Sequence, residues 1–320
     1  MNRTEKPLHG NMDENEVHND KPVQSASPPP AEQELTVQQA LELAVQQYTA
    51  GHLPEAEGIF QQILRHAGSD RSVAKVLLGV IAQKVDRNYH TVIPHNIAEL
   101  PQSVISPQAT YSPWLNDENF ESAYKAASGN TLVCLYRAYE LWQLVEQVAH
   151  LQGDVLEVGV WRGGTGLVIA EAMRSRKIEA TLFLADSFTG VVKAGSQDTT
   201  YKGGEHSDTS IDIVRDLFAR YGIGGFEILS GVFPDETASR ISDRRFRFCH
   251  IDVDTHDSAK DVFEWIWPRL VHGGVVVFDD YGFKGCEGVT QLVNDERGRK
   301  DALSLYNLNG HAVLVKMEAT

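Results

Sequence analysis

The chain has 320 residues, about twice the length of a typical domain, so it can bury a sizeable core without disulfide or metal support. Its 29 Lys and Arg residues against 44 Asp and Glu residues give a net charge of −15, the wrong sign for binding nucleic acid or an anionic membrane. Three cysteines, Cys134, Cys249 and Cys286, have no metal-type or redox-type spacing and are typical of core residues in a reducing compartment.

Residues 1–34 have the composition of a disordered leader. They include the run KPVQSASPPPAEQE, carry seven acidic residues against three basic ones, and offer almost no apolar side chain to bury. The segment also lacks the apolar stretch of a secretory signal, and no run in the chain approaches the about 18 apolar residues of a membrane span. We therefore expect a cytoplasmic protein that binds neither membrane nor nucleic acid.

Residues 35–88 predict a small helical region. The stretch LTVQQALELAVQQYTAGHLPEAEGIFQQILRHAGSD has apolar residues at helical spacing and is broken by Gly51 and Pro54, which predicts two helices and a turn. RSVAKVLLGVIAQKVDRN repeats the first helix after 34 residues, so the region resembles a tetratricopeptide repeat, although a plain helical hairpin fits as well. One and a half repeats are fewer than the about three that support themselves, so we expect this segment to rest on the remaining chain or on a second subunit. It is also where we expect a protein partner to bind.

Residues 89–112, rich in Pro, His and Ser, predict a linker, and residues 113–320 predict one α/β domain in which residues 113–152 form two amphipathic lead-in helices. From Gly153, strand-like and helical runs alternate: DVLEVGV, a helix from Thr165, TLFLADS, the helix SIDIVRDLFARYG, FEILSGV, FRFCHIDVD, the helix SAKDVFEWIWPRL, and VVVFDDY. This alternation is typical of a doubly wound, mostly parallel, Rossmann-like sheet. The run LSLYNLNGHAVLVKM predicts two further strands joined at Asn309-Gly310, so we expect an antiparallel hairpin to close the sheet.

The loop after the first predicted strand reads LEVGVWRGGTG, where open α/β sheets bind nucleotide-like ligands. It lacks the G-x-G-x-x-G spacing of dinucleotide sites and the Lys of a Walker loop. Glu157, before Gly159, would repel a pyrophosphate but can hold an ammonium group or a ribose hydroxyl, and S-adenosylmethionine offers both. Asp186, 20 residues beyond Gly166, stands where acids bind ribose hydroxyls, although Asp186 and Ser187 also fit a helix cap or a turn. With the terminal hairpin, this loop favours a methyltransferase that uses S-adenosylmethionine.

Four acidic residues follow two strands that we expect to be neighbours: Asp252 and Asp254 in HIDVDTHD, and Asp279 and Asp280 in FDDYG. Carboxylates that meet at one rim either raise a pKa or recruit a cation, and a set of oxygen ligands selects Mg²⁺ or Ca²⁺ over zinc. Acids that cap the following helices are the alternative, which explains one residue of each pair.

From Gly153 to Lys316 the chain resembles the macrocin O-methyltransferase family. The matching stretches are LEVGVWRGGTG, LADSFTGV, ARYGIGGFEILSGVFPDET, CHIDVDTHDSAKDVFEWIWPRL and GGVVVFDDYGFKGCEGV, and YRAYELWQLVEQV resembles the family's lead-in helix. The resemblance implies an enzyme that uses S-adenosylmethionine and a divalent cation, Mg²⁺ or another, to methylate a hydroxyl of a small molecule, such as a sugar of a macrolide. It also implies a homo-oligomer. His256 stands where relatives commonly have Tyr, which leaves the identity of the acceptor open.

Site residues follow from the resemblance by position. The implied metal ligands are Asp252, Asp279 and Asp280. The implied cofactor-binding residues are Glu157, Gly159, Gly163, Asp186, Ser187 and Gly231.

Methyl transfer also requires a group that removes the proton of the acceptor hydroxyl. A metal that coordinates the hydroxyl would lower its pKa. The polar, Gly-rich run from Val191 to Ser210 predicts a lid over the site. His206 in this lid and Asp254 are the main candidates for the base, with the alternatives His250 and His256 left open.

Three polar residues of the predicted lid are candidates for holding the acceptor: Lys193, Tyr201 and Lys202. Two other hypotheses explain the sequence. The domain could be a non-catalytic, methyltransferase-like interaction protein with a helical adaptor, or a methyltransferase acting on nitrogen or carbon without a metal. The intact acidic set argues against the first, and metal-independent turnover would favour the second.

Overall fold

The computed structural model describes four parts of the chain, residues 36–49, 59, 63 and 109–318. The chain divides into two units, one up to Ile81 and one from Ala82, and each is considered by itself. Within the described residues, no helix combines the length and the apolar character that crossing a bilayer requires.

In the first unit, α1 spans Val37–Thr49, where the sequence predicts a helix. Thr36 caps its N-terminus, because the Thr36 hydroxyl accepts the N–H of Gln39 at 3.3 Å. The predicted leader of residues 1–34 and most of the tetratricopeptide-like segment and of the linker lie outside the described residues.

In the second unit, the first described helices are the predicted lead-in helices. They are η1 Pro113–Asn116, α4 Glu118–Ala127, α5 Leu135–Gln147 and η2 Val148–His150. α4 begins after Asp117, whose carboxylate accepts the N–H of Phe120 at 3.0 Å. Phe120 and Trp142 are almost fully buried, so both helices belong to the core of this unit.

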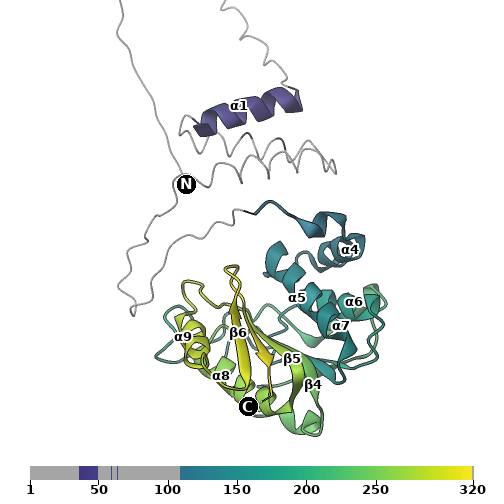
Figure 1. The fold of residues 1–320 in the computed structure, drawn as a ribbon, viewed down its shortest axis with the longest axis vertical. Coiled ribbons are helices and arrows are strands. Elements are labelled where there is room, and N and C mark those ends of the chain that lie inside the picture. Colours follow the sequence, from purple (N-terminus) through teal and green to yellow (C-terminus); the bar gives the residue numbers. More distant parts are fainter. Residues whose placement is uncertain (1–35, 50–58, 60–62, 64–108, 319–320) are drawn as a thin grey trace, which may run out of the picture. The chain divides into compact units, whose positions relative to one another are not determined.

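A seven-stranded sheet forms the centre of the second unit (Figure 1). Its strands are β1 Asp154–Val158, β2 Leu182–Asp186, β3 Phe226–Ser230, β4 Phe246–Ile251, β5 Leu270–Phe278, β6 Ala302–Tyr306 and β7 Ala312–Lys316. They lie in the order β3-β2-β1-β4-β5-β7-β6. The first five are parallel, and β7 pairs antiparallel with both β5 and β6. This confirms the predicted sheet, and it places β1 and β4 at the centre, where the chain reverses its direction of travel across the sheet.

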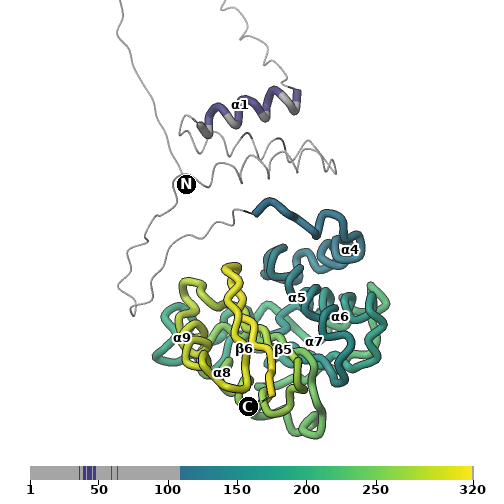
Figure 2. The backbone as a smooth tube through the Cα atoms, viewed as in Figure 1, coloured from purple at the N-terminus to yellow at the C-terminus, as the bar shows by residue number. Residues whose placement is uncertain are grey.

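Helices cover both faces of this sheet, which is why its strands are apolar runs (Figure 2). The further helices are α6 Gly164–Ser175, α7 Ile211–Arg220, η3 Ala238–Ile241, α8 His256–Ile266, η4 Trp267–Arg269 and α9 Glu287–Asp295. The lead-in helices, α6 and α7 enclose one buried cluster with the sheet, and α8 and α9 enclose the other. The doubly wound architecture is therefore the one predicted.

The helix α9 was not predicted. Gly288 in its first turn weakens the helical pattern. The structure explains this glycine, since a Cβ atom there would lie 2.8 Å from both Asp198 Oδ1 and the Cβ atom of His256.

The terminal hairpin is present, but its connection is longer than predicted. The last paired residues are Tyr306 and Ala312, so a five-residue loop joins the strands instead of the two residues Asn309-Gly310. Leu308 and Gly310 adopt positive φ angles of 60° and 102°. The extra length lets side chains of the loop reach α5, which becomes important for the site.

Candidate active site

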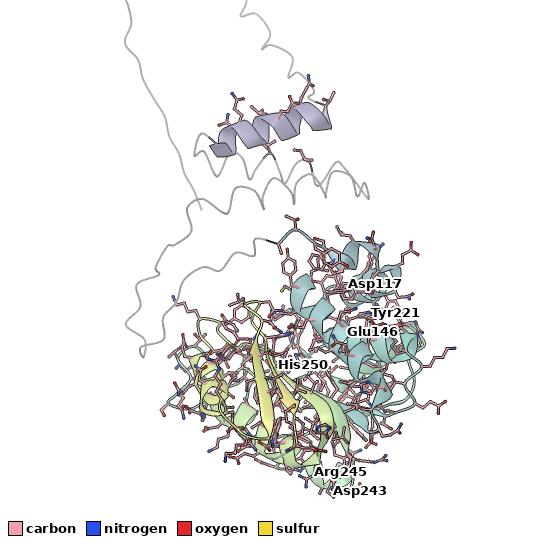
Figure 3. All side chains as sticks on the ribbon, viewed as in Figure 1. Asp117, Glu146, Tyr221, Asp243, Arg245 and His250 are labelled. Carbon is pink, nitrogen blue, oxygen red and sulfur yellow. The ribbon has the colours of Figure 1, made fainter. Side chains whose placement is uncertain are left out.

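A cavity opens at the carboxyl ends of the central parallel strands, where the switch in strand order lies. Figure 3 shows His250 near the centre of the domain, whereas Asp243 and Arg245, which precede β4, lie at the edge from which that strand starts. The lining includes eight of the eleven predicted site residues: Gly159, Asp186, Ser187, His206, Asp252, Asp254, Asp279 and Asp280. The lining does not include Glu157, Gly163 or Gly231.

Gly159 bends the chain sharply after β1. Its φ angle is 91°, and a Cβ atom on it would lie 1.6 Å from the carbonyl oxygen of Asp252, a distance that no side chain tolerates. The N–H of Asp252 donates to the carbonyl of Val158 at 2.9 Å. This close approach sets the ends of β1 and β4 side by side and brings the glycine loop next to the acidic rim.

Asp186, at the end of β2, organises the same loop. One carboxylate oxygen accepts the N–H groups of Val160 and Trp161, both at 2.8 Å, and the other accepts the N–H of Phe188 at 2.6 Å. Burial raises the pKa of Asp186, and the three N–H groups oppose this effect. The contact with Phe188 is the turn that the sequence allowed as an alternative. Oδ1, which accepts only the N–H of Phe188, keeps a second lone pair that can accept a ligand hydroxyl.

Glu157 lies behind the cavity, because Val158 takes the lining position on β1 and side chains alternate along a strand. Its Oε1 atom lies 3.1 Å from Nδ1 of His250, and both side chains are fully buried. Burial raises the pKa of Glu157, and the hydrogen bond and charge of His250 oppose this effect. His250, a candidate base, therefore pairs with Glu157 and does not line the cavity.

The other two predicted cofactor residues shape the backbone behind the lining. Gly163, with a φ angle of 84°, precedes α6. Gly231, with a φ angle of 138°, donates its N–H to the carbonyl of Asp186 at 2.9 Å.

The predicted acidic rim forms at the ends of β4 and β5. Carboxylate oxygens of Asp252, Asp279 and Asp280 lie within 4.8 Å of one another. Asp254 and Asp280 form a second group of the same size with the thiol of Cys286. Oδ2 of Asp280 is buried and has no hydrogen-bond partner among the described residues. Three carboxylates that share so little space form an oxygen-rich set of the kind that binds a divalent cation.

Burial and mutual repulsion divide the rim into two kinds of carboxyl group. Burial raises the pKa values of Asp252 and Asp280 well above the usual range, and the charge of Asp279 raises both further. Burial acts on Asp279 in the same direction, but the hydrogen bond and charge of His311 and the charge of Arg137 outweigh it and hold the pKa of Asp279 well below the usual range. Asp279 is thus the anchored anion of the rim.

Arg137 and His311 supply this anchoring, and neither is among the site residues predicted from the sequence. Arg137 of α5 donates to Oδ2 of Asp279, and Nε2 of His311 lies 2.7 Å from Oδ1. Both cations come from elements far from β5 in the sequence. Their signals were a basic residue on the buried face of the lead-in helix, in YRAYELW, and a histidine just before the apolar run of β7.

The predicted lid places four of its residues on the cavity. Val191, Val192, Tyr201 and His206 belong to the lining. The ring of His206 lies 6.0 Å from that of Tyr201 and 6.4 Å from that of Trp161, centroid to centroid. Asp254 has a strained φ angle of 63°, and burial raises its pKa, while the hydrogen bond from Tyr201 lowers it.

The two lysines proposed to hold the acceptor have other partners. Lys193 pairs with Asp235 at 2.8 Å and with Asp261 at 2.6 Å. Lys202 donates to the carbonyls of Asp198 and Thr199.

His256, a further candidate base, begins α8 and its Nδ1 lies 2.7 Å from Asp257. It is not part of the lining. Asp254 and His206 are thus the two candidate bases that line the cavity.

The chain matches the family model described as macrocin-O-methyltransferase over residues 60–313. This match extends further toward the N-terminus than Gly153, where the resemblance seen in the sequence begins. A tetracenomycin relative from Streptomyces olivaceus, an 8-demethyl-8-(2,3-dimethoxy-alpha-L-rhamnosyl)-tetracenomycin-C 4'-O-methyltransferase, is 33% identical over 182 residues, 53% of this chain and 68% of the relative. Mycinamicin III 3''-O-methyltransferase of Micromonospora griseorubida is 29% identical over 188 residues, 54% of this chain and 74% of the relative.

Solved structures agree on the fold. The O-methyltransferase NovP superposes with a TM-score of 0.52 at 23% identity, covering 62% of this chain and 88% of its own. The calicheamicin methyltransferase CalS11 has a TM-score of 0.50 at 16% identity, covering 64% of this chain and 93% of its own.

Proposed function

The chain belongs to the macrocin O-methyltransferase family, and we propose that it transfers the methyl group of S-adenosylmethionine to a sugar hydroxyl of a small molecule with the help of a divalent cation. The observation that carries the proposal is the meeting of a glycine-bent loop and four aspartates at one cavity. The names of the two curated relatives, both O-methyltransferases and one acting on a rhamnosyl-bearing compound, support the class of reaction and acceptor.

The cofactor would lie against the ends of β1 and β2. S-adenosylmethionine brings the methyl group, and Gly159 lets it approach the backbone closely. The free lone pair on Oδ1 of Asp186 suits a ribose hydroxyl, and Ser187 lines the same wall. Glu157, Gly163 and Gly231 would support this wall from behind, since they lie outside the lining.

The acidic rim fits a divalent cation, Mg²⁺ or another. Its donor atoms are oxygens, and one of them is buried without a hydrogen-bond partner among the described residues. The rim has four aspartates but only two neighbouring cations, Arg137 and His311, both at Asp279. About two negative charges therefore remain to be neutralised when all are ionised. Asp252, Asp279 and Asp280 would hold the ion. When bound, it would lower the pKa of the acceptor hydroxyl and fix its direction.

Asp254 is the residue we propose as the proton acceptor. It lines the cavity beside Asp280, and the phenol of Tyr201, which lines the same cavity, lowers the pKa of its carboxyl group. Burial raises its pKa toward the working range of a general base. His206, next to Tyr201, is the second residue that can receive the proton.

Calorimetric titration of the purified chain with S-adenosylmethionine and with NAD, each with and without Mg²⁺, tests the proposal. We expect S-adenosylmethionine to bind and NAD not to bind, and the reverse result would overturn it. Turnover of a rhamnosyl-bearing acceptor should stop when EDTA is added. Turnover that persists in EDTA would favour methylation at nitrogen or carbon, and cofactor binding without turnover on such acceptors would favour an interaction protein.

A further inference from the structure

Glu140 of α5 receives three hydrogen bonds from the loop between β6 and β7. The side-chain amides of Asn307 and Asn309 donate to it, the second at 2.9 Å, and Nδ1 of His311 lies 2.6 Å from its Oε2 atom. His311 is fully buried. One carboxylate on the lead-in helix therefore holds the whole tip of the hairpin.

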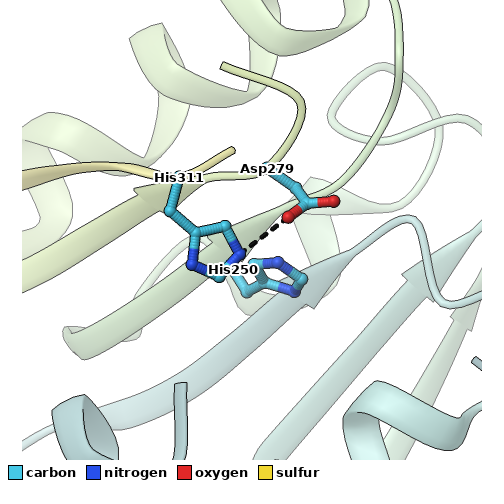
Figure 4. A group of neighbouring side chains, drawn as sticks. All are labelled: His250, Asp279 and His311. Carbon is cyan, nitrogen blue, oxygen red and sulfur yellow. Dashed lines mark ion pairs between the residues drawn. The ribbon is translucent and has the colours of Figure 1, made fainter. Parts of the chain in front are cut away.

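The other nitrogen of His311 faces Asp279 (Figure 4). Nε2 lies 2.7 Å from Oδ1 of Asp279, while Arg137 donates to Oδ2. Each oxygen of this carboxylate thus has a cationic neighbour, and the plane of the group is fixed. Arg137 and Glu140 are one helical turn apart, so α5 acts on Asp279 directly through Arg137 and indirectly through His311.

The same three side chains in Figure 4, His250, Asp279 and His311, offer three atoms within 4.8 Å that resemble a transition-metal site. The contacts argue against that interpretation. Both nitrogens of His311 lie within 2.7 Å of carboxylate oxygens, so each already faces a carboxylate of this chain, Glu140 or Asp279. The group supports a carboxylate instead of binding an ion of its own.

We propose that His311, held by Glu140, is a positioning residue that orients Asp279 toward the cation of the acidic rim. The inference rests on the proposed function, because it needs Asp279 to be a metal ligand. Partners that hold a metal-binding side chain typically contribute about 10–100-fold to metal affinity or activity. The two oxygens of Asp279 are held from two different elements, α5 and the residue before β7, so the loss of either contact lets the carboxylate turn.

Mn²⁺ binding to the full chain tests the proposed role of His311 without any turnover. The electron paramagnetic resonance signal of the free ion measures this binding. His311→Asn keeps an amide near the position of Nδ1, facing Glu140, and loses the contact with Asp279. His311→Gln places its amide near the position of Nε2, facing Asp279. We expect H311N to weaken Mn²⁺ binding about 10–100-fold and H311Q to restore most of it, with S-adenosylmethionine affinity unchanged in both.

Asn309→Ala is the matched control, because it removes two hydrogen bonds that anchor the hairpin, to Glu140 and from the N–H of His311, and leaves the imidazole of His311 and Asp279 in place. A role confined to anchoring the hairpin predicts equal effects of N309A and H311N on Mn²⁺ binding, and that result would overturn the inference. Should H311N not fold, Glu140→Gln gives the same comparison: weaker Mn²⁺ binding than N309A supports the proposal, and equal binding overturns it. Failure of the unmodified chain to bind Mn²⁺ would refute the proposed metal site itself. Equal Mn²⁺ binding by N309A and H311N would refute only the role of His311.

Discussion

Asp279 and Asp280 are adjacent in the sequence but differ in their surroundings. Asp279 is neutralised by Arg137 and His311, whereas Oδ2 of Asp280 is buried without a hydrogen-bond partner among the described residues. Replacing each by its uncharged isostere should therefore change stability in opposite directions.

Asp279→Asn leaves the guanidinium of Arg137 and the imidazolium of His311 without their shared anion. Breaking a buried ion pair from one side costs about 3–5 kcal/mol, so we expect a loss of this order in the free energy of unfolding. Chemical denaturation in the absence of metal measures it. An unchanged midpoint would show that the two cations are not paired with Asp279 in solution.

Asp280→Asn removes a carboxylate whose ionised form is disfavoured by burial and by the charges of Asp279 and Asp254. We expect the metal-free variant to be more stable than the parent chain near neutral pH by about 0.5–2 kcal/mol, a gain that active-site substitutions commonly give. Metal-dependent turnover should be lost in the same variant. Thermal unfolding with EDTA and a methyl-transfer assay with Mg²⁺ check the two halves, and a destabilised variant would contradict the electrostatic account.

At the scale of elements, one buried side chain of the predicted lid caps the start of α8, beside the contacts that Val192 and Lys193 make with the same helix. The carboxylate of Asp198 accepts the N–H of Gly195 at 2.8 Å and the N–H of His256, the first residue of α8, at 2.9 Å. It therefore serves as an N-cap supplied from another segment.

Asp198→Ala should remove this cap at a cost of about 1 kcal/mol and loosen the loop around residue 198. Limited proteolysis should then cut between Val191 and Ser210 sooner than in the parent chain. Ser210→Ala is a useful comparison, because Ser210 caps α7 in the ordinary way from its own position. Equal cutting in the two variants would show that Asp198 does not hold the lid.

A second junction between elements predicts a pH dependence. Asp301, before β6, accepts hydrogen bonds from Arg299 at 2.9 Å, from Trp267 at 2.8 Å and from Lys316 at 3.1 Å, which hold its pKa well below the usual range. A carboxyl group with a lowered pKa in the folded state stabilises the fold above its unfolded pKa, and this contribution is lost as the pH falls below that value. Asp301→Asn should therefore flatten the dependence of unfolding free energy on pH between about pH 5 and pH 1, and an unchanged slope would contradict the assignment.

The sequence predicts the strands and most helices well because each carries a local periodic signal. It also predicts the acidic rim, since Asp252 and Asp279 each follow a strand of an expected parallel pair. Arg137 could not be assigned this way, because its contact with Asp279 spans 142 residues and depends on how α5 packs. The place of Glu157 behind the lining could not be predicted either, since its motif position did not show that Val158 would take the lining place.

At the scale of the whole molecule, part of the negative charge gathers at one cavity. Five of the 44 acidic residues line it, in a domain whose strands are covered on both faces by helices. The family match from residue 60 to residue 313 includes residues that the sequence assigned to a separate helical segment and linker.

The position of β7 between β5 and β6 has a consequence for how the protein is made. A chain synthesised from its N-terminus presents β5 as an open edge until β7, some 30 residues later, inserts beside it. His311 arrives with that same strand, so Asp279 acquires its last partner when the exposed edge is covered. The nascent protein thus completes the surroundings of Asp279 and covers the open edge of β5 in one event.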